Sequence, residues 1–231
     1  MRTNSRVILA DYYGYPAQHY HATFDHLTHK RDAHGNKVPV ALLTDLYLVD
    51  SNDNRLENVR QDTYISADGQ SIIADHVWVE FNKTWFNTPH ELLQGDQVFF
   101  KADVEQYKIS RADVVSKRQA IWKDAQAMND QVYSAWQGSK HNLHGTQYQS
   151  AYEQMRAHIQ SNNEMARIKQ QSIPLVDYSL TNVQNLKVIK YLNKSVLRTK
   201  YSYYQYSKQG YKYSAWLAAR SMAFVNTGNI F

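Results

Sequence analysis

Basic and aromatic side chains are concentrated in the last quarter of the sequence. From Tyr178 to Phe231 the chain has no aspartate or glutamate, yet it holds eight lysine and arginine residues and eight of the 18 tyrosines. The whole chain has a formal net charge of +5, so the residues before Tyr178 are net acidic. Lysine and arginine neutralise phosphates, and tyrosine rings stack on unpaired bases. This composition predicts a surface that binds single-stranded DNA or RNA.

Two sets of residues are the candidate contacts to nucleic acid. In the alternating segment 97–109, Phe99 and Lys101 share the face opposite Val98 and Phe100, which are expected in the core. The first set lies on or just after this segment and comprises Phe99, Lys101, Tyr107, Lys108 and Arg111. The second set lies in the acid-free quarter and comprises Lys187, Lys190, Lys194, Arg198, Lys200, Tyr201, Tyr203, Tyr204, Tyr206, Lys208, Tyr211, Lys212 and Tyr213.

The acid-free quarter has two other interpretations. Its tyrosines pack against the folded body and its lysines are merely solvated, or the segment binds a membrane surface. The membrane interpretation requires residues 214–224 to form an exposed amphipathic helix, and the spread of the lysines along extended-looking sequence disfavours it. The absence of acidic residues favours binding, because a face that is only solvated usually mixes both signs of charge.

Catalytic and metal-binding patterns are weak. His19 and His21 alternate on one predicted strand near Asp25, but zinc sites usually show tighter pairings, so we predict no metal and no cofactor. The sequence has no glycine-rich phosphate loop, nucleophile elbow or His-Glu-x-x-His helix. We therefore predict a binding protein and not an enzyme.

The composition also limits the compartment. The chain has no cysteine, which removes disulfides, thiolate metal sites and cysteine nucleophiles and fits a reducing cytosol. No segment approaches the roughly 18 consecutive apolar residues of a membrane span, and the apolar run after the N-terminus is too short for the core of a signal peptide. We expect a cytoplasmic protein without a membrane span.

The first half of the chain has the two-residue periodicity of half-buried strands. Alternating or β-forming runs cover residues 20–27, 38–49, 72–81 and 97–109, and turn-forming clusters separate them. A further strand is expected over residues 176–191, with a turn at Thr181 and Asn182.

The middle of the chain changes to helical periodicity. Between residues 112 and 136, and again between 148 and 159, apolar residues recur at steps of three and four. An antiparallel helical hairpin is therefore expected before Pro174. Beyond Tyr191 the pattern is ambiguous: residues 201–206 are compatible with a strand, and residues 214–224 have helix-forming composition.

Three segments carry a resemblance to a known group of proteins. They are Ile73-Ala74-Asp75-His76-Val77-Trp78, then Leu92-Leu93-Gln94-Gly95-Asp96 with the strand that ends at Tyr107, and Asp177-Tyr178-Ser179-Leu180. In this order they resemble small OB-fold-like accessory proteins of plasmids, phages and integrative elements of Gram-positive bacteria. The chain departs from that pattern at Lys108-Ile109-Ser110-Arg111, where those proteins have a Lys-Gly-Tyr-like loop. The resemblance implies an OB fold and a mobile-element setting.

The predicted fold class is α+β, an OB-like small β-barrel with an inserted helical hairpin and a basic, Tyr-rich C-terminal extension. The barrel comprises residues 1–111 together with 174–191, the hairpin comprises 112–173, and the extension comprises 192–231.

Two functions from different classes follow. The first is a nucleic-acid-binding accessory protein of a mobile element, with the hairpin as a clamp or an oligomerisation surface. The alternative is a protein-interaction module that inhibits a host-defence effector such as a CRISPR or restriction nuclease. In that case Trp122, Trp136 and Tyr152 of the hairpin would form the interface, and their exposure to solvent would favour it.

Overall fold

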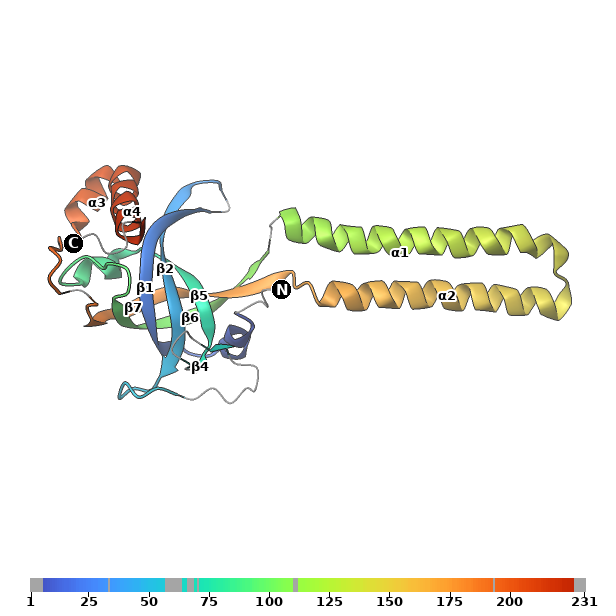
Figure 1. Ribbon diagram of the computed structural model, residues 1–231, viewed down its shortest axis with the longest axis horizontal. Helices are drawn as coiled ribbons and strands as arrows, with labels where there is room; N and C mark the ends of the chain where they lie inside the picture. The colour runs from blue at the N-terminus through green and yellow to red at the C-terminus, as the bar shows by residue number, and fades with distance from the viewer. Residues whose placement is uncertain are drawn as a thin grey trace. The chain divides into compact units, whose positions relative to one another are not determined.

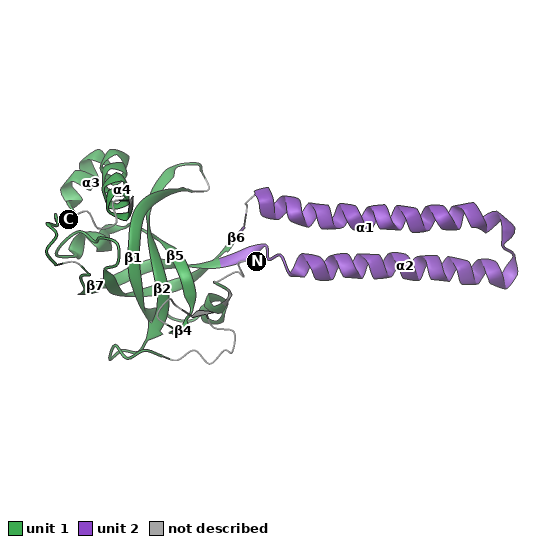
Figure 2. Cartoon of the chain, in the orientation of Figure 1, with its two compact units in different colours: residues 1–107, 178–231 green, residues 108–177 purple. Residues whose placement is uncertain are grey.

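The chain forms two compact units in a computed structural model. The described residues are 6–32, 34–56, 64–65, 69, 71–109, 112–192 and 194–226. Unit 1 comprises residues 1–107 and 178–231, and unit 2 comprises residues 108–177 (Figure 2). Unit 1 is built on an antiparallel sheet with C-terminal helices and unit 2 is a helical hairpin, so the α+β class is confirmed.

Unit 1 is organised around a five-stranded sheet with the strand order β5-β2-β1-β6-β7 (Figure 1). The strands run over β1 Gln18–Arg31, β2 Lys37–Val49, β5 Ala74–Glu80, β6 Gln97–Lys108 and β7 Val176–Lys190. These are the five strands that the periodicity predicted. Shorter elements are the 3-10 helices η1 (Val7–Tyr12) and η2 (Lys83–Asn87) and the pair β3 (Tyr64–Ile65) and β4 (Ser71–Ile72).

The described strands form an open sheet and not a closed barrel. Its edge strands, β5 and β7, are joined by a side-chain hydrogen bond, in which Ser179 Oγ donates to the carbonyl oxygen of Trp78 at 3.0 Å. The expected turn at Thr181 and Asn182 is absent, because β7 is continuous there. Asn182 and Asn185 have φ values of 53° and 52°. Such left-handed residues depart from the extended geometry that a regular backbone ladder requires.

The core of unit 1 is the inward face of this sheet. Tyr20 and Phe24 on β1 and Phe100 on β6 are fully buried, which the alternation of residues 97–109 predicted for Phe100. Trp85 from η2 is also fully buried, and its indole Nε1 donates to the carbonyl oxygen of Glu80 at 3.1 Å. Aromatic side chains from several elements therefore fill one apolar core.

The C-terminal extension ends in two helices, α3 (Tyr203–Gln209) and α4 (Tyr211–Asn226), drawn in red in Figure 1. The helix expected over residues 214–224 is confirmed. Residues 203–206 are helical and not a strand, because Ser202 caps α3 by accepting a hydrogen bond from the backbone N–H of Gln205. The described part of the extension belongs to unit 1.

Helix α4 covers an otherwise open stretch of β1. Strand β6 pairs with β1 only from Gln18 to Thr23. Farther along β1, the backbone N–H of Leu27 donates to Ser221 Oγ of α4 at 2.8 Å, and that Oγ lies 3.2 Å from the Leu27 carbonyl oxygen. The serine hydroxyl thus satisfies backbone groups that would otherwise be buried without partners.

Unit 2 is the expected helical hairpin, α1 (Ala112–Ser139) and α2 (Gly145–Gln171), joined through the short 3-10 helix η3 (Lys140–Asn142). Polar side chains bridge its seam: Asn129 Nδ2 donates to Asn163 Oδ1 at 2.8 Å, and Asn162 Nδ2 donates to Asn129 Oδ1 at 3.1 Å. Among the helices of the described ranges, none combines the length and the hydropathy that crossing a membrane requires.

Candidate nucleic-acid interface

The outward face of the sheet gathers aromatic side chains from three adjacent strands. His19 and His21 alternate with core residues of β1 and therefore lie on the opposite face of the sheet, where His19 is partly exposed and His21 is covered by its neighbours, with 8% exposed. The strand register places His21 opposite Phe99 of β6 on one side and opposite Tyr47 of β2 on the other. His19 lies opposite Lys101. We call His19, His21, Tyr47 and Phe99 the outer strip.

The rings of the outer strip contact one another in sequence. His19 stacks on Phe99 with ring centroids 5.4 Å apart and an interplanar angle of 22°. The edge of His21 meets Phe99 at 5.6 Å, and His21 lies 5.1 Å from Tyr47. These contacts restrict the four side chains, so a ligand that stacks on the exposed rings costs the protein little further side-chain entropy.

Three cationic side chains flank the outer strip. The Lys187 ammonium lies 5.9 Å from the centroid of Phe99, the Arg55 guanidinium carbon lies 4.0 Å from that of Tyr47, and Lys101 neighbours His19. Cations beside aromatic rings offer phosphate contacts and base stacking at the same place.

A carboxylate fixes one end of the outer strip. His21 Nδ1 lies 2.8 Å from the Tyr47 hydroxyl, and His21 Nε2 lies 2.5 Å from Asp53 Oδ1. Asp53 occupies a turn after β2 and has a left-handed φ of 71°. Its negative charge disfavours an anion at this end of the strip, whereas Lys101 and Lys187 favour an anion at the other end.

A second basic and aromatic surface lies on the C-terminal helices. Its exposed members are Tyr203, Tyr204, Lys208, Tyr211 and Lys212, which we call the helical patch. Cations of other elements approach it: the Lys83 ammonium lies 5.5 Å from the Tyr203 ring, and the Lys37 ammonium donates to the Tyr211 hydroxyl at 3.1 Å. The helical patch therefore combines aromatic rings with cations, as the outer strip and its flanking cations do together.

His29 lies beside the helical patch. Its ring lies 5.0 Å from that of Tyr211, and its Nε2 lies 3.3 Å from Ser214 Oγ. Partial burial and the nearby charge of Lys37 lower the pKa of His29 below its ordinary value. The neutral form of His29 is thus favoured beside these cations.

Some predicted contacts lie in the core. Tyr201 and Tyr213 are each only 4% exposed. The Tyr201 hydroxyl accepts from the backbone N–H of Leu92 at 3.0 Å, and the Tyr213 hydroxyl accepts from that of Ser202 at 2.9 Å. Burial raises the pKa of Tyr201 above its ordinary value. For these two tyrosines the structure matches the alternative in which the tyrosines pack against the body.

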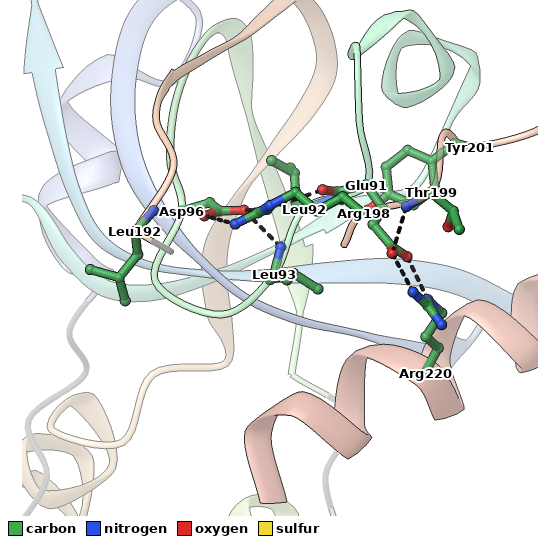
Figure 3. A network of polar contacts seen from close by, with 9 residues as sticks. All are labelled: Glu91, Leu92, Leu93, Asp96, Leu192, Arg198, Thr199, Tyr201 and Arg220. Atoms are coloured by element: carbon green, nitrogen blue, oxygen red, sulfur yellow. Dashed lines mark hydrogen bonds and ion pairs between the residues drawn. The ribbon is translucent and has the colours of Figure 1, made fainter. Parts of the chain in front are cut away.

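Arg198 belongs to an ion-pair network that fastens the C-terminal extension (Figure 3). Its guanidinium forms a two-pronged contact with the fully buried carboxylate of Asp96, and that carboxylate also accepts from the backbone N–H groups of Leu93 and Leu192 at 2.8 and 3.0 Å. A charge engaged in this way is already neutralised. Arg198 therefore has a structural role in this network.

A second ion pair completes this network, which we call the clasp. Arg220 of α4 binds both carboxylate oxygens of Glu91, at 2.8 and 2.6 Å, and the backbone N–H of Thr199 donates to Glu91 Oε1 at 3.0 Å (Figure 3). Burial alone would raise the pKa of Glu91, but these hydrogen bonds and the Arg220 charge hold the pKa below its ordinary value. The clasp thus ties two arginines of the acid-free quarter to acids of the turn before β6.

The remaining predicted residues have varied positions. Tyr206 is half-buried and packs against Phe86. Arg111 lies outside the described residues. Exposed positions at the ends of β6 and β7 and in the extension belong to Tyr107, Lys108, Lys190, Lys194 and Lys200. The structure therefore brings Phe99, Lys101 and Lys187 together.

Sequence reasoning missed His19, His21, Tyr47 and Arg55 as parts of this surface. The two histidines alternate with core residues of β1, and this alternation is the signal that places them on the same face as Phe99. Arg55 carried no such signal, because it follows a turn. Within the described ranges, no group of three or more histidine, aspartate and glutamate side chains is arranged to hold a metal ion.

Comparisons with known proteins find no relative of this chain. No family model, no curated protein and no solved structure matches this chain. The resemblance to OB-fold-like accessory proteins stays a prediction.

Proposed function

We propose that this protein binds single-stranded DNA or RNA through the outer strip and its flanking cations. The observation that carries the proposal is the run of contacting rings over β2, β1 and β6, with Lys101 and Lys187 beside it. Bases would stack on Phe99 and His19, and phosphates would contact the two lysines. This is the way in which an OB-like sheet uses its face, and the setting we propose is that of an accessory protein of a mobile element.

The helical patch extends this proposal within unit 1. Its tyrosines and lysines would contact further nucleotides without sequence preference, because every base has a ring face. The paired arginines of the clasp are not part of the proposed contact surface, because their charges are used inside the protein. The proposed binding therefore rests on lysines and exposed rings.

The test is fluorescence anisotropy of labelled single-stranded DNA, duplex DNA and RNA with the full chain at two salt concentrations. Substitutions are preferable to truncation of the extension, because Tyr201 and Tyr213 belong to the core. Phe99→Ala is expected to weaken single-strand binding by about 1–3 kcal/mol, the usual value for one stacked base. Lys187→Gln is expected to reduce the salt dependence of the affinity.

The matched control is Lys123→Gln, which removes an exposed lysine of the hairpin. It is expected to leave affinity and salt dependence unchanged. Absence of binding to all three nucleic acids would overturn the proposal. Binding that Phe99→Ala and Lys187→Gln leave intact would also overturn the assignment to the outer strip.

The hairpin supports a second candidate function, a protein-interaction module that inhibits a host-defence effector. The favouring observation is exposure: Trp122 is 51% exposed and Tyr152 is 39% exposed. Trp136 is half-buried among Tyr133, Tyr148 and Tyr152. Inhibition of a purified nuclease that Trp122→Ala abolishes and Phe99→Ala preserves would favour this second function.

A further inference from the structure

The hairpin buries very little of its own apolar surface. Among its described helical residues, only Ala125, Met155 and Ala166 are buried. Large apolar side chains stay exposed, including Trp122 and Tyr133, which is 47% exposed. Isolated helices gain most of their stability from packing an apolar face against a neighbour. Two helices with so small a shared core therefore leave substantial apolar surface for an occupant.

One side of the hairpin has a groove. A groove of about 520 Å³ runs between the helices, with Trp122 of α1 on one side and Arg156, Ile159 and Arg167 of α2 among the residues on the other. Asn163 lines the same groove at the seam. An exposed tryptophan in a groove with a charged rim has the composition of a protein interface.

The charges along α2 form a pattern that is complementary to itself. Glu153, Arg156, Gln160, Glu164 and Arg167 follow one another at steps of three, four, four and three, so they form one stripe on the helix. The order of charges is negative, positive, neutral, negative, positive, and reversing the direction of the helix exchanges every sign. An identical helix placed antiparallel and centred on Gln160 would therefore pair each charge with its opposite.

We propose that the groove flank binds a second copy of this chain, with the two hairpins face to face and antiparallel in a four-helix bundle. Glu153 would lie opposite Arg167 of the second copy, and Arg156 opposite its Glu164. Trp122 and Tyr133 would be covered between the two hairpins. Such a contact uses the same surface on both copies and closes as a two-fold dimer.

The overall charge of the hairpin agrees with a second copy as the occupant. Helix α1 has three acidic and three basic residues, α2 has two acidic and three basic residues, and η3 adds Lys140. Each hairpin thus has a net charge of only +2, so two hairpins repel each other weakly and do not select a strongly charged partner. The inference goes beyond nucleic-acid binding and does not depend on it.

The experiment measures the mass of the full chain by sedimentation equilibrium over a wide range of concentration. One variant carries Arg156→Glu with Arg167→Glu, and the other carries Glu153→Arg with Glu164→Arg. Each variant alone places like charges opposite each other. The dimer dissociation constant is expected to rise at least about tenfold, which corresponds to about 1.4 kcal/mol. An equimolar mixture of the two variants is expected to restore a dimer, because its stripes are again complementary.

The mixture also shows that both variants remain folded, since unfolded chains would not rescue each other. Lys123→Glu, on an exposed α1 position that does not line the groove, is the matched control and is expected to dimerise like the wild type. A wild-type chain that is monomeric up to its solubility limit would overturn the proposal and leave the groove to a different protein. Dimers that persist in both variants would also overturn it, because another surface would then hold the copies together.

Discussion

The two units of this protein use apolar side chains in opposite ways. Unit 1 buries large rings completely, among them Tyr20, Trp85 and Phe100, in a core shared by its sheet and its C-terminal helices. Unit 2 buries only three side chains in its helices and leaves Trp122 and Tyr133 half-exposed. Unit 1 is therefore stabilised by contacts within the chain. The stability of unit 2 is expected to depend on the partner that covers its groove.

The ion pairs show the same contrast. In unit 1 the pair of Asp96 and Arg198 is almost completely withdrawn from water. In unit 2 the pair of Glu164 and Arg167 is exposed on one helix face. Exposed pairs contribute little because water and salt screen them, whereas removing one member of a buried pair leaves an uncompensated charge.

Breaking the buried pair is expected to have the largest effect. Asp96→Asn leaves the Arg198 charge without its carboxylate, and the free energy of unfolding of unit 1 is expected to fall by about 3–5 kcal/mol. Urea denaturation followed through tryptophan fluorescence measures this loss, because Trp85 is part of the core. Glu164→Gln is the matched control in unit 2 and is expected to leave this transition unchanged. Equal effects of the two substitutions would contradict the contrast between the units.

The contact of α4 with β1 gives a smaller effect. Ser221→Ala removes the partner of the Leu27 backbone N–H in a buried place. One buried group left without a partner costs about 1–3 kcal/mol, so the free energy of unfolding is expected to fall by that amount. Hydrogen exchange should show the loss at the Leu27 amide. Ser134→Ala, at an exposed position of α1, is the control. Unchanged protection of Leu27 in Ser221→Ala would mean that α4 does not cap β1.

The elements that the sequence predicted correctly are those with strong periodicity. The alternation of β1 and β6 and the three-and-four spacing of the hairpin each leave one arrangement that separates apolar from polar side chains. The predicted closure of the sheet into a barrel was wrong, because alternation does not show whether the edge strands β5 and β7 pair with each other. The left-handed residues of β7, Asn182 and Asn185, have no periodic signal either.

The candidate site was predictable only in part. Phe99 and Lys101 follow from local alternation, whereas the meeting of Phe99 with Tyr47 depends on strand order, which the alternation does not encode. The acid-free quarter was informative about charge but not about burial. Its acidic partners, Asp96 and Glu91, lie about a hundred residues away in the sequence, so no local pattern links them to Arg198 and Arg220.

The acid sensitivity of the clasp is expected to be the smallest of these effects, since Arg220 is partly exposed and solvent screens its charge. The pKa of Glu91 is lowered in the folded protein, so its ion pair contributes fully above the ordinary value of 4.5. That contribution is lost as the pH falls below 4.5 and through the folded pKa. Asp32 and Asp50 also have lowered pKa values through hydrogen bonds in their turns, so the wild type alone does not isolate Glu91.

The difference in free energy of unfolding between the wild type and Glu91→Gln isolates the contribution of Glu91. This difference is expected to be constant above pH 4.5 and to shrink toward acid, because the side-chain amide of the variant does not take up a proton in this range. Glu153→Gln in the hairpin should show no such trend for the unfolding of unit 1. A difference that stays constant into strong acid would mean that Arg220 does not hold Glu91 charged. The clasp would then act through packing and backbone hydrogen bonds alone.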